Sequence, residues 1–124
     1  MKNSSITALI AWQWSIYGNS HQDRRNLLIH VVAVPLFAGG VLAALIGLFG
    51  LAWHVLVLGL AGMALGFALQ GIGHRYERQA PPAFTSRGQF VIRLFIEQFV
   101  VFPRFVLSGE CLRRLRHPKT GDAI

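Results

Sequence analysis

The sequence predicts an all-α integral membrane protein: a helical hairpin with an N-terminal interfacial helix and a third, partly embedded helix. Hydrophobic residues make up 53% of the 124 residues and charged residues only 14%, which is too apolar for a disordered chain. The run from Asn26 to His74 contains no Asp, Glu, Lys or Arg. It has room for two spans of about 20 residues each and a tight turn, and a backbone in lipid satisfies itself as a helix. We therefore expect a single membrane domain over residues 1–124.

The first expected element is an interfacial helix over residues 6–17. This segment mixes aliphatic residues with Trp12, Trp14 and Tyr17. Aromatic rings of this kind favour the headgroup layer over the bilayer centre, so the helix should lie at the membrane surface.

The two spans are expected at about residues 27–51 and 53–73. Pro35 lies inside the first span, where its missing N–H and its ring should kink or break the helix. Small residues recur at helical spacing in both spans and should let the two backbones pack closely. These residues are Gly39, Ala43, Gly47, Gly62 and Gly66.

A third apolar segment, residues 90–107, follows a polar loop. It contains Arg93 and Glu97 at i, i+4 spacing and Pro103. Charged groups are costly in lipid unless they are paired or hydrated. The segment could therefore be an amphipathic helix on the surface, but we favour a partly embedded helix that packs on the hairpin with the ion pair turned inward.

The formal net charge of +7 could indicate a nucleic-acid partner, but the arginines stand where membrane topology explains them. Arg24 and Arg25 precede the hairpin, whereas Arg75, Arg78 and Arg87 follow it. Positive residues favour the cytoplasmic side. We therefore expect a lipid bilayer and no nucleic acid as partner, both hairpin ends in the cytoplasm, and a bacterial inner membrane as the location.

Two histidines should lie at the same depth in the bilayer. Ala52 is the midpoint between His30 and His74, and it is also where the hairpin should turn. Each histidine is then about 33 Å from the turn at 1.5 Å per residue, near the cytoplasmic boundary of the hydrocarbon. His54, just after the turn, should lie on the opposite side.

Polar residues near these histidines keep helical spacing, as if each helix turned one polar stripe towards a shared site. Asn26 and His30 are four residues apart. Gln70, His74 and Glu77 would share one face if the second helix continued past residue 73. His21 could join them only if the chain bends before the first span.

Histidine and carboxylate ligands with open positions suit non-haem Fe(II). His21, His30, His74 and Glu77 could supply such a site, and ionisable groups at membrane depth are functional more often than those in soluble cores. The alternative is that these groups only bond one another and backbone carbonyls at a helix boundary.

Two motifs flank the hairpin: HQDRRNLLIHVVAVP from His21 to Pro35, preceded by Tyr17, and QGIGHRYERQAPPA from Gln70 to Ala83. Together they resemble the paired signature of the Mpo-like 2-hydroxy-fatty-acid dioxygenases, which are small multi-spanning membrane proteins. The positions that match the family pattern are Tyr17, His21, Asn26, His30, Pro35, Gly73, His74, Glu77, Pro82 and Ala83.

The resemblance implies an Fe(II)-dependent dioxygenase of fatty acid α-oxidation, which shortens a 2-hydroxy fatty acid by one carbon with O₂ and without 2-oxoglutarate. The family's characterised activity belongs to phytosphingosine breakdown in the endoplasmic reticulum. The resemblance also implies that His21, His30 and His74 are candidate iron ligands, with Glu77 as a further ligand or a residue that supports them. Asn26, beside them in the motif, is the other catalytic candidate.

The fatty acid substrate would lie with its tail in the bilayer and its carboxylate at the histidines. Four arginines are placed to attract that carboxylate, although topology alone would place them similarly. They are Arg24, Arg25, Arg75 and Arg78.

Two rival functions remain open on sequence alone. His30 and His74 could be the axial ligands of a haem. Alternatively, the small-residue patches could recruit a partner span, so that the protein is a non-catalytic scaffold. The scaffold hypothesis predicts that alanine at either histidine leaves partner binding and metal content unchanged.

Overall fold

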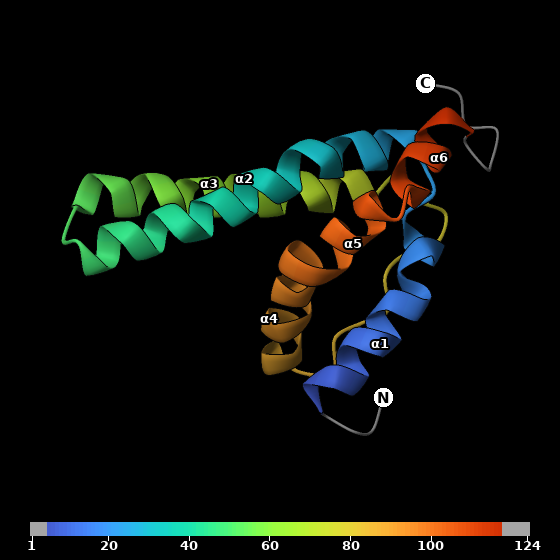
Figure 1. The fold of residues 1–124 in the computed structure, drawn as a ribbon, viewed down its shortest axis with the longest axis horizontal. Helices are drawn as coiled ribbons and strands as arrows, with labels where there is room; N and C mark the ends of the chain where they lie inside the picture. Colours follow the sequence, from blue (N-terminus) through green and yellow to red (C-terminus); the bar gives the residue numbers. More distant parts are fainter. Residues whose placement is uncertain (1–4, 118–124) are drawn as a thin grey trace.

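A computed structural model describes residues 5–117 of the chain, and every regular element in this part is helical (Figure 1), which confirms the predicted fold class. The elements, in chain order, are α1 (Ile6–Tyr17), the 3₁₀ turn η1 (Gly18–Ser20), α2 (Arg24–Phe49), α3 (Trp53–His74), α4 (Arg87–Ile96), the π-helical turn η2 (Glu97–Val101), α5 (Phe102–Leu107) and α6 (Glu110–Arg116).

Helices α2 and α3 form a long antiparallel hairpin (Figure 1). Each is long and apolar enough to cross a membrane, with mean hydropathies of 2.4 and 2.0. Asp23 caps the N-terminus of α2, because its side chain accepts a hydrogen bond from the backbone N–H of Arg25. At the other end Leu51 takes a left-handed conformation, with φ of 53°. The N–H of Ala52 then donates to the carbonyl of Gly47 at 2.8 Å, which closes the turn close to the predicted midpoint.

Pro35 does not break α2, which runs unbroken from Arg24 to Phe49. A proline removes one backbone donor, and membrane helices tolerate that loss because neighbouring groups satisfy the freed carbonyl. Pro35 is also exposed.

Glycines bring the backbones of α2 and α3 into contact. A Cβ atom added at Gly40 would lie 2.6 Å from the carbonyl oxygen of Gly59, and one added at Gly66 would lie 2.8 Å from the carbonyl oxygen of Ala33. Both distances are shorter than real Cβ atoms allow, so any larger residue would push the helices apart. In lipid there is no hydrophobic driving force between helices, and van der Waals contacts at such small residues are what holds helices together.

The predicted small-residue patches are only partly right. Gly47 and Gly66 are buried in the interface, as expected. Gly39, however, has open space around its α-carbon, and a Cβ at Gly62 would make an ordinary contact at 3.5 Å. In the middle of α2 the contact surface therefore includes Gly40 in place of Gly39, whereas nearer the turn it includes Gly47 as predicted.

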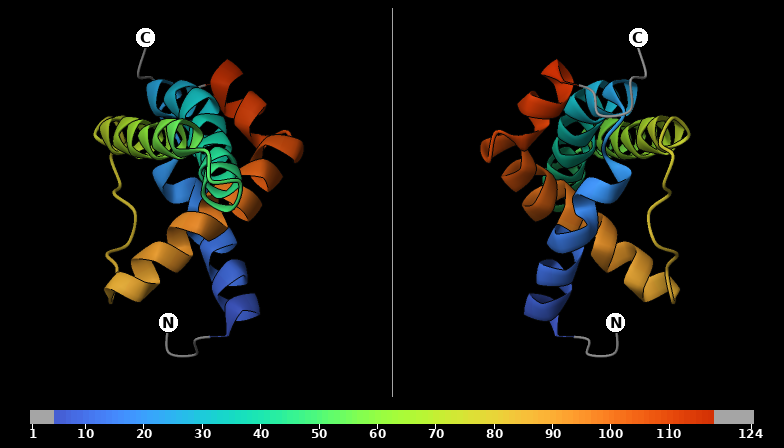
Figure 2. Two further views of the ribbon diagram at one scale, coloured as in Figure 1. Left: turned by 90° about the vertical axis from the view of Figure 1, so that its left-hand side faces the viewer. Right: turned by 90° about the vertical axis from the view of Figure 1, so that its right-hand side faces the viewer.

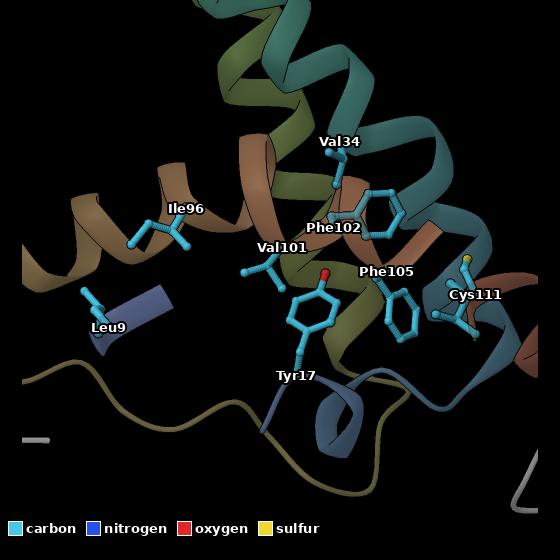
Figure 3. Packing of buried hydrophobic residues seen from close by; sticks show 9 residues of the cluster. Leu9, Tyr17, Val34, Ile96, Val101, Phe102, Phe105 and Cys111 are labelled. Carbon is cyan, nitrogen blue, oxygen red and sulfur yellow. The ribbon is translucent and has the colours of Figure 1, made fainter. Parts of the chain in front are cut away.

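The remaining helices gather at the end of the hairpin opposite the Leu51 turn, and Figure 2 shows α1 and α4 leaving it on the same side. They pack through one buried apolar cluster, part of which is shown in Figure 3. Its members are Leu9, Tyr17, Leu27, Val34, Ile96, Val101, Phe102, Phe105 and Cys111.

The third apolar segment is not one regular helix, because η2 separates α4 from α5. Arg93 and Glu97 both turn inward, but they do not form the expected ion pair. The guanidinium of Arg93 instead donates to the carbonyls of Pro82 and Ala83, and Glu97 faces two histidines.

Candidate metal centre

Four ionisable side chains from four separate segments meet at the end of the hairpin opposite the Leu51 turn. They are His21, which follows η1, His30 in α2, His74 at the end of α3, and Glu97 at the start of η2. One ligand atom from each lies within 4.8 Å of the others. We call these four residues the histidine–glutamate cluster.

The three imidazole rings stand nearly perpendicular to one another. Their centroids are 4.7 to 4.9 Å apart, and the angles between ring planes are 82° to 89°. Nε2 of His21, Nε2 of His30 and Nδ1 of His74 are buried, and none has a hydrogen-bond partner among the described residues. Buried polar atoms without partners are costly, and a shared metal ion would satisfy all three. The residues therefore fit a metal.

Backbone carbonyls orient two of these rings. Nδ1 of His21 lies 2.7 Å from the carbonyl oxygen of Tyr17, and Nδ1 of His30 lies 3.0 Å from that of Asn26. Because a carbonyl oxygen only accepts, each Nδ1 must carry the hydrogen, which leaves the Nε2 lone pair free for a ligand bond. Burial lowers the pKa of His21 from its ordinary value, more than the neighbouring Glu97 raises it, which favours this neutral ring.

Tyr17 holds the carboxylate of the cluster in place. Its hydroxyl donates to Oε2 of Glu97 at 2.7 Å, and the same oxygen lies 3.4 Å from Nε2 of His21 and 3.5 Å from Nε2 of His30. Burial and the adjacent Glu97 charge raise the pKa of Tyr17 well above its ordinary value. The hydroxyl therefore stays protonated and remains a donor. The Tyr17 ring also stacks on His21, with centroids 3.7 Å apart.

The π-helical turn explains why Glu97 faces the histidines. A π turn adds a residue to the helical repeat and is frequent at functional sites. Both Glu97 and Gln98 point inward here, and Gln98 exchanges two hydrogen bonds of 2.9 Å with Gln70 of α3. This amide pair anchors η2 one helical turn from His74.

Sequence reasoning missed Glu97 as a member of the cluster. Its i, i+4 spacing from Arg93 is typical of a helical ion pair, and a π turn has no spacing signature of its own. The available signal was a carboxylate inside an apolar segment, which is rare unless it is functional.

The structure places Glu77 outside the cluster, because α3 ends at His74 and the predicted polar stripe stops there. The Glu77 carboxylate accepts hydrogen bonds from the backbone N–H groups of Gln22 and Asp23, each at 2.9 Å, and from Nδ2 of Asn26 at 2.7 Å. It therefore fixes the segment that joins His21 to α2. The chain bends in this segment, as we expected it to if His21 was to join the other histidines.

Asn26 is likewise a positioning residue. Its side chain donates to the carbonyl of Ser20 and to Glu77, and its own carbonyl orients His30. Of the predicted candidates, the structure thus brings His21, His30 and His74 together and leaves Asn26 and Glu77 behind them.

An apolar cavity of about 280 Å³ opens beside the cluster. His21, His74 and Glu97 line one part of it, and four aromatic residues also line it. The aromatic rings are those of Tyr17, Phe67, Phe84 and Phe90.

The four arginines predicted to bind a carboxylate do not line this cavity. Arg25 pairs with Asp23 at 2.8 Å and lies over the ring of Tyr76. Arg75 and Arg78 do not face the cavity, and Arg24 is half-buried. A position beside the hairpin in the sequence does not determine which way a side chain faces, and the arginine that lines the cavity is Arg93.

No curated protein and no solved structure matches this chain. One family does match, over residues 8–106, and it is described as 2-hydroxy-palmitic acid dioxygenase Mpo1-like. The match spans α1 to α5, and so it includes all four residues of the histidine–glutamate cluster and the walls of the cavity. It confirms the resemblance found in the two sequence motifs, and the chain belongs to the Mpo1-like family.

Proposed function

We propose that this protein is an Fe(II)-dependent dioxygenase that shortens 2-hydroxy fatty acids by one carbon. One observation supports this most: three buried histidine nitrogens that have no hydrogen-bond partner among the described residues converge with a carboxylate beside an apolar cavity. Membership of a dioxygenase family supports it independently.

The donor set favours iron over structural zinc. The cluster offers three imidazoles and one carboxylate, whereas closed zinc sites commonly use thiolates. Cys111 is buried in the apolar core instead. Four protein donors leave positions open on an octahedral ion, as oxygenase sites require. When bound, ferrous iron would supply the redox chemistry that O₂ needs at this site.

The overall reaction balances without a second organic substrate. A 2-hydroxy acid and O₂ yield the acid that is one carbon shorter, together with CO₂ and water. The bond between C1 and C2 breaks, C1 leaves as CO₂, and C2 becomes the new carboxyl carbon. These two carbons supply all four electrons that O₂ accepts, so 2-oxoglutarate is not required.

The chain's own residues would orient the reactants and exclude water. Tyr17 keeps Glu97 directed at the histidines, while Glu77 and Asn26 hold the backbone that carries His21 and His30. The apolar cavity would accept the part of the substrate nearest the reacting carbons.

We place the hairpin in the lipid bilayer of a bacterial inner membrane, with both ends in the cytoplasm. A fatty acid could then reach the cavity from the bilayer. The two long apolar helices and the arginines that flank them support this orientation.

The cluster geometry supports the haem alternative less well. Haem iron has two axial positions, but here four side chains converge. The ring centroids of His30 and His74 are 4.9 Å apart, and His21 lies equally close to both. A porphyrin between His30 and His74 would have to displace His21.

Metal analysis combined with turnover of 2-hydroxypalmitate tests the proposal. We expect the purified protein to bind about one iron and to release pentadecanoic acid and CO₂ when O₂ is present. His74→Ala should lose both iron and turnover, whereas the exposed His54→Ala serves as the matched control and should keep them. Protein that contains no iron, and forms no product after iron is added, would rule the proposal out. A strong visible haem band would favour the alternative.

A further inference from the structure

One arginine is buried in the wall of the cavity. Arg93 is only 5% exposed, and it lies on α4 four residues before Glu97. Among the described residues that line the cavity, Arg93 is the one lysine or arginine.

The guanidinium of Arg93 is held in a fixed orientation by neutral groups. It donates to the carbonyl of Pro82 at 3.0 Å and to that of Ala83 at 3.2 Å. Its charged carbon lies 4.2 Å from the ring centroid of Phe84 and 5.2 Å from that of Trp12. Carbonyls and aromatic faces stabilise the orientation but do not neutralise the charge.

Arg93 retains unused capacity to bind an anion. A guanidinium has five N–H donors, and two are used by the carbonyls. Its Nε is buried without a hydrogen-bond partner in the part of the chain that the structure describes, and no carboxylate of residues 5–117 pairs with it within 4.0 Å. Glu97 acts on the Arg93 charge only from beyond that distance. A buried charge without a direct partner is costly, which suggests a ligand that supplies the opposite charge.

We propose that Arg93 binds the carboxylate of the substrate and is the residue that distinguishes a free 2-hydroxy acid from its ester or thioester. This inference rests on the proposed function. A guanidinium matches the planar geometry of a carboxylate and can donate two parallel hydrogen bonds to it. An ester or thioester has no negative charge to offer.

The position of Arg93 also sets the orientation of the substrate. Residues four apart on a helix lie about 5 to 6 Å apart at their β-carbons, so a carboxylate bound at Arg93 would lie beside Glu97. C1 and C2 would then face the histidine–glutamate cluster. The alkyl chain would extend past Phe67 and Phe84, which are 44% and 46% exposed, towards the lipid.

Binding of two probes in detergent micelles tests the inference without requiring turnover. The probes are 2-hydroxypalmitate and its methyl ester, and the signal is the tryptophan fluorescence of the protein, to which Trp12 beside Arg93 contributes. Charge-assisted hydrogen bonds should make the wild type bind the acid at least about tenfold more tightly than the ester. Arg93→Gln should remove that preference while its affinity for the ester changes less than about twofold. Arg87→Gln, an exposed arginine on the same helix, is the matched control and should behave as wild type.

The outcomes separate this inference from the proposed function. If wild type turns over 2-hydroxypalmitate and Arg93→Gln keeps its iron but still prefers the acid, Arg93 does not bind the carboxylate. If wild type neither binds nor converts the acid, the proposed function fails and the inference fails with it. Should Arg93→Gln lose helicity, Arg93→Met takes its place, because it keeps a long side chain and removes the charge. An undiminished preference of that variant for the acid would overturn the inference.

Discussion

The different positions of the two glutamates lead to a sharp prediction about which of them binds the metal. Glu97 lies within the histidine–glutamate cluster, whereas Glu77 holds the backbone behind it. Glutamine has nearly the same shape as glutamate but no negative charge. Glu97→Gln and Glu77→Gln are therefore the same chemical change, made once inside the histidine–glutamate cluster and once outside it.

Glu97→Gln should weaken iron binding more than Glu77→Gln. Residues that support metal ligands typically change metal affinity about 10- to 100-fold when they are substituted, and Glu77 acts in this way through Asn26 and the backbone of Gln22 and Asp23. Because Glu97 is itself a proposed ligand, its substitution should lower the iron affinity by more than that range. We expect a loss of more than about 100-fold for Glu97→Gln.

Glu77→Gln should instead show mainly in stability. Oε2 of Glu77 accepts from Gln22, Asp23 and Asn26, and Oε1 also accepts from Gln22. A glutamine can place its one oxygen at Oε2 but then has a donor at Oε1, and it removes the charge that strengthens all of these hydrogen bonds. A hydrogen bond to a charged group contributes about 1.5 to 3 kcal/mol. Since the site is only partly buried, we expect a net destabilisation of about 2 kcal/mol.

Two measurements check this pair of variants: iron affinity by competition with a chelator, and unfolding of the apo protein in detergent. Loss of iron by Glu77→Gln together with wild-type iron affinity in Glu97→Gln would refute this assignment of the ligand. In that case the carboxylate named from the sequence motif, rather than the one in the cluster, would be the ligand.

Three further predictions follow from the hairpin and the cluster. Gly40→Ala should destabilise the protein by about 1 to 3 kcal/mol through overpacking. Gly39→Ala is the control and should not destabilise it, because position 39 faces open space. Equal unfolding midpoints of the two variants in detergent would contradict the close contact of Gly40 with α3. Tyr17→Phe should keep the fold but weaken iron binding about tenfold, because it frees the cluster carboxylate; unchanged iron affinity would refute this role. In a cysteine-free background, an impermeant thiol reagent added to whole cells should label a cysteine at His54 and not one at Arg75, and labelling of both would disprove the orientation.

Local properties of the chain were enough to predict the hairpin. The length of the segment without charged residues determines that two helices can cross a bilayer. His30 and His74 are equally far from Ala52 in the sequence, which predicted that they would meet. Their ring centroids are 4.9 Å apart. Helix–helix register was harder to predict: a difference of one residue turns a helix by about 100°, so Gly40 rather than Gly39 faces α3.

Only the tertiary structure decided which polar groups complete the site. Glu97 and Arg93 come from a third segment whose direction depends on the π turn and on packing against α1 and the hairpin, and periodicity along the sequence carries no information about that packing. Glu77 stands in the sequence motif, but the end of α3 at His74 turns its carboxylate towards the backbone of Gln22 and Asp23. Spacing along a chain determines depth and helix face, whereas the convergence of separate segments depends on how they pack.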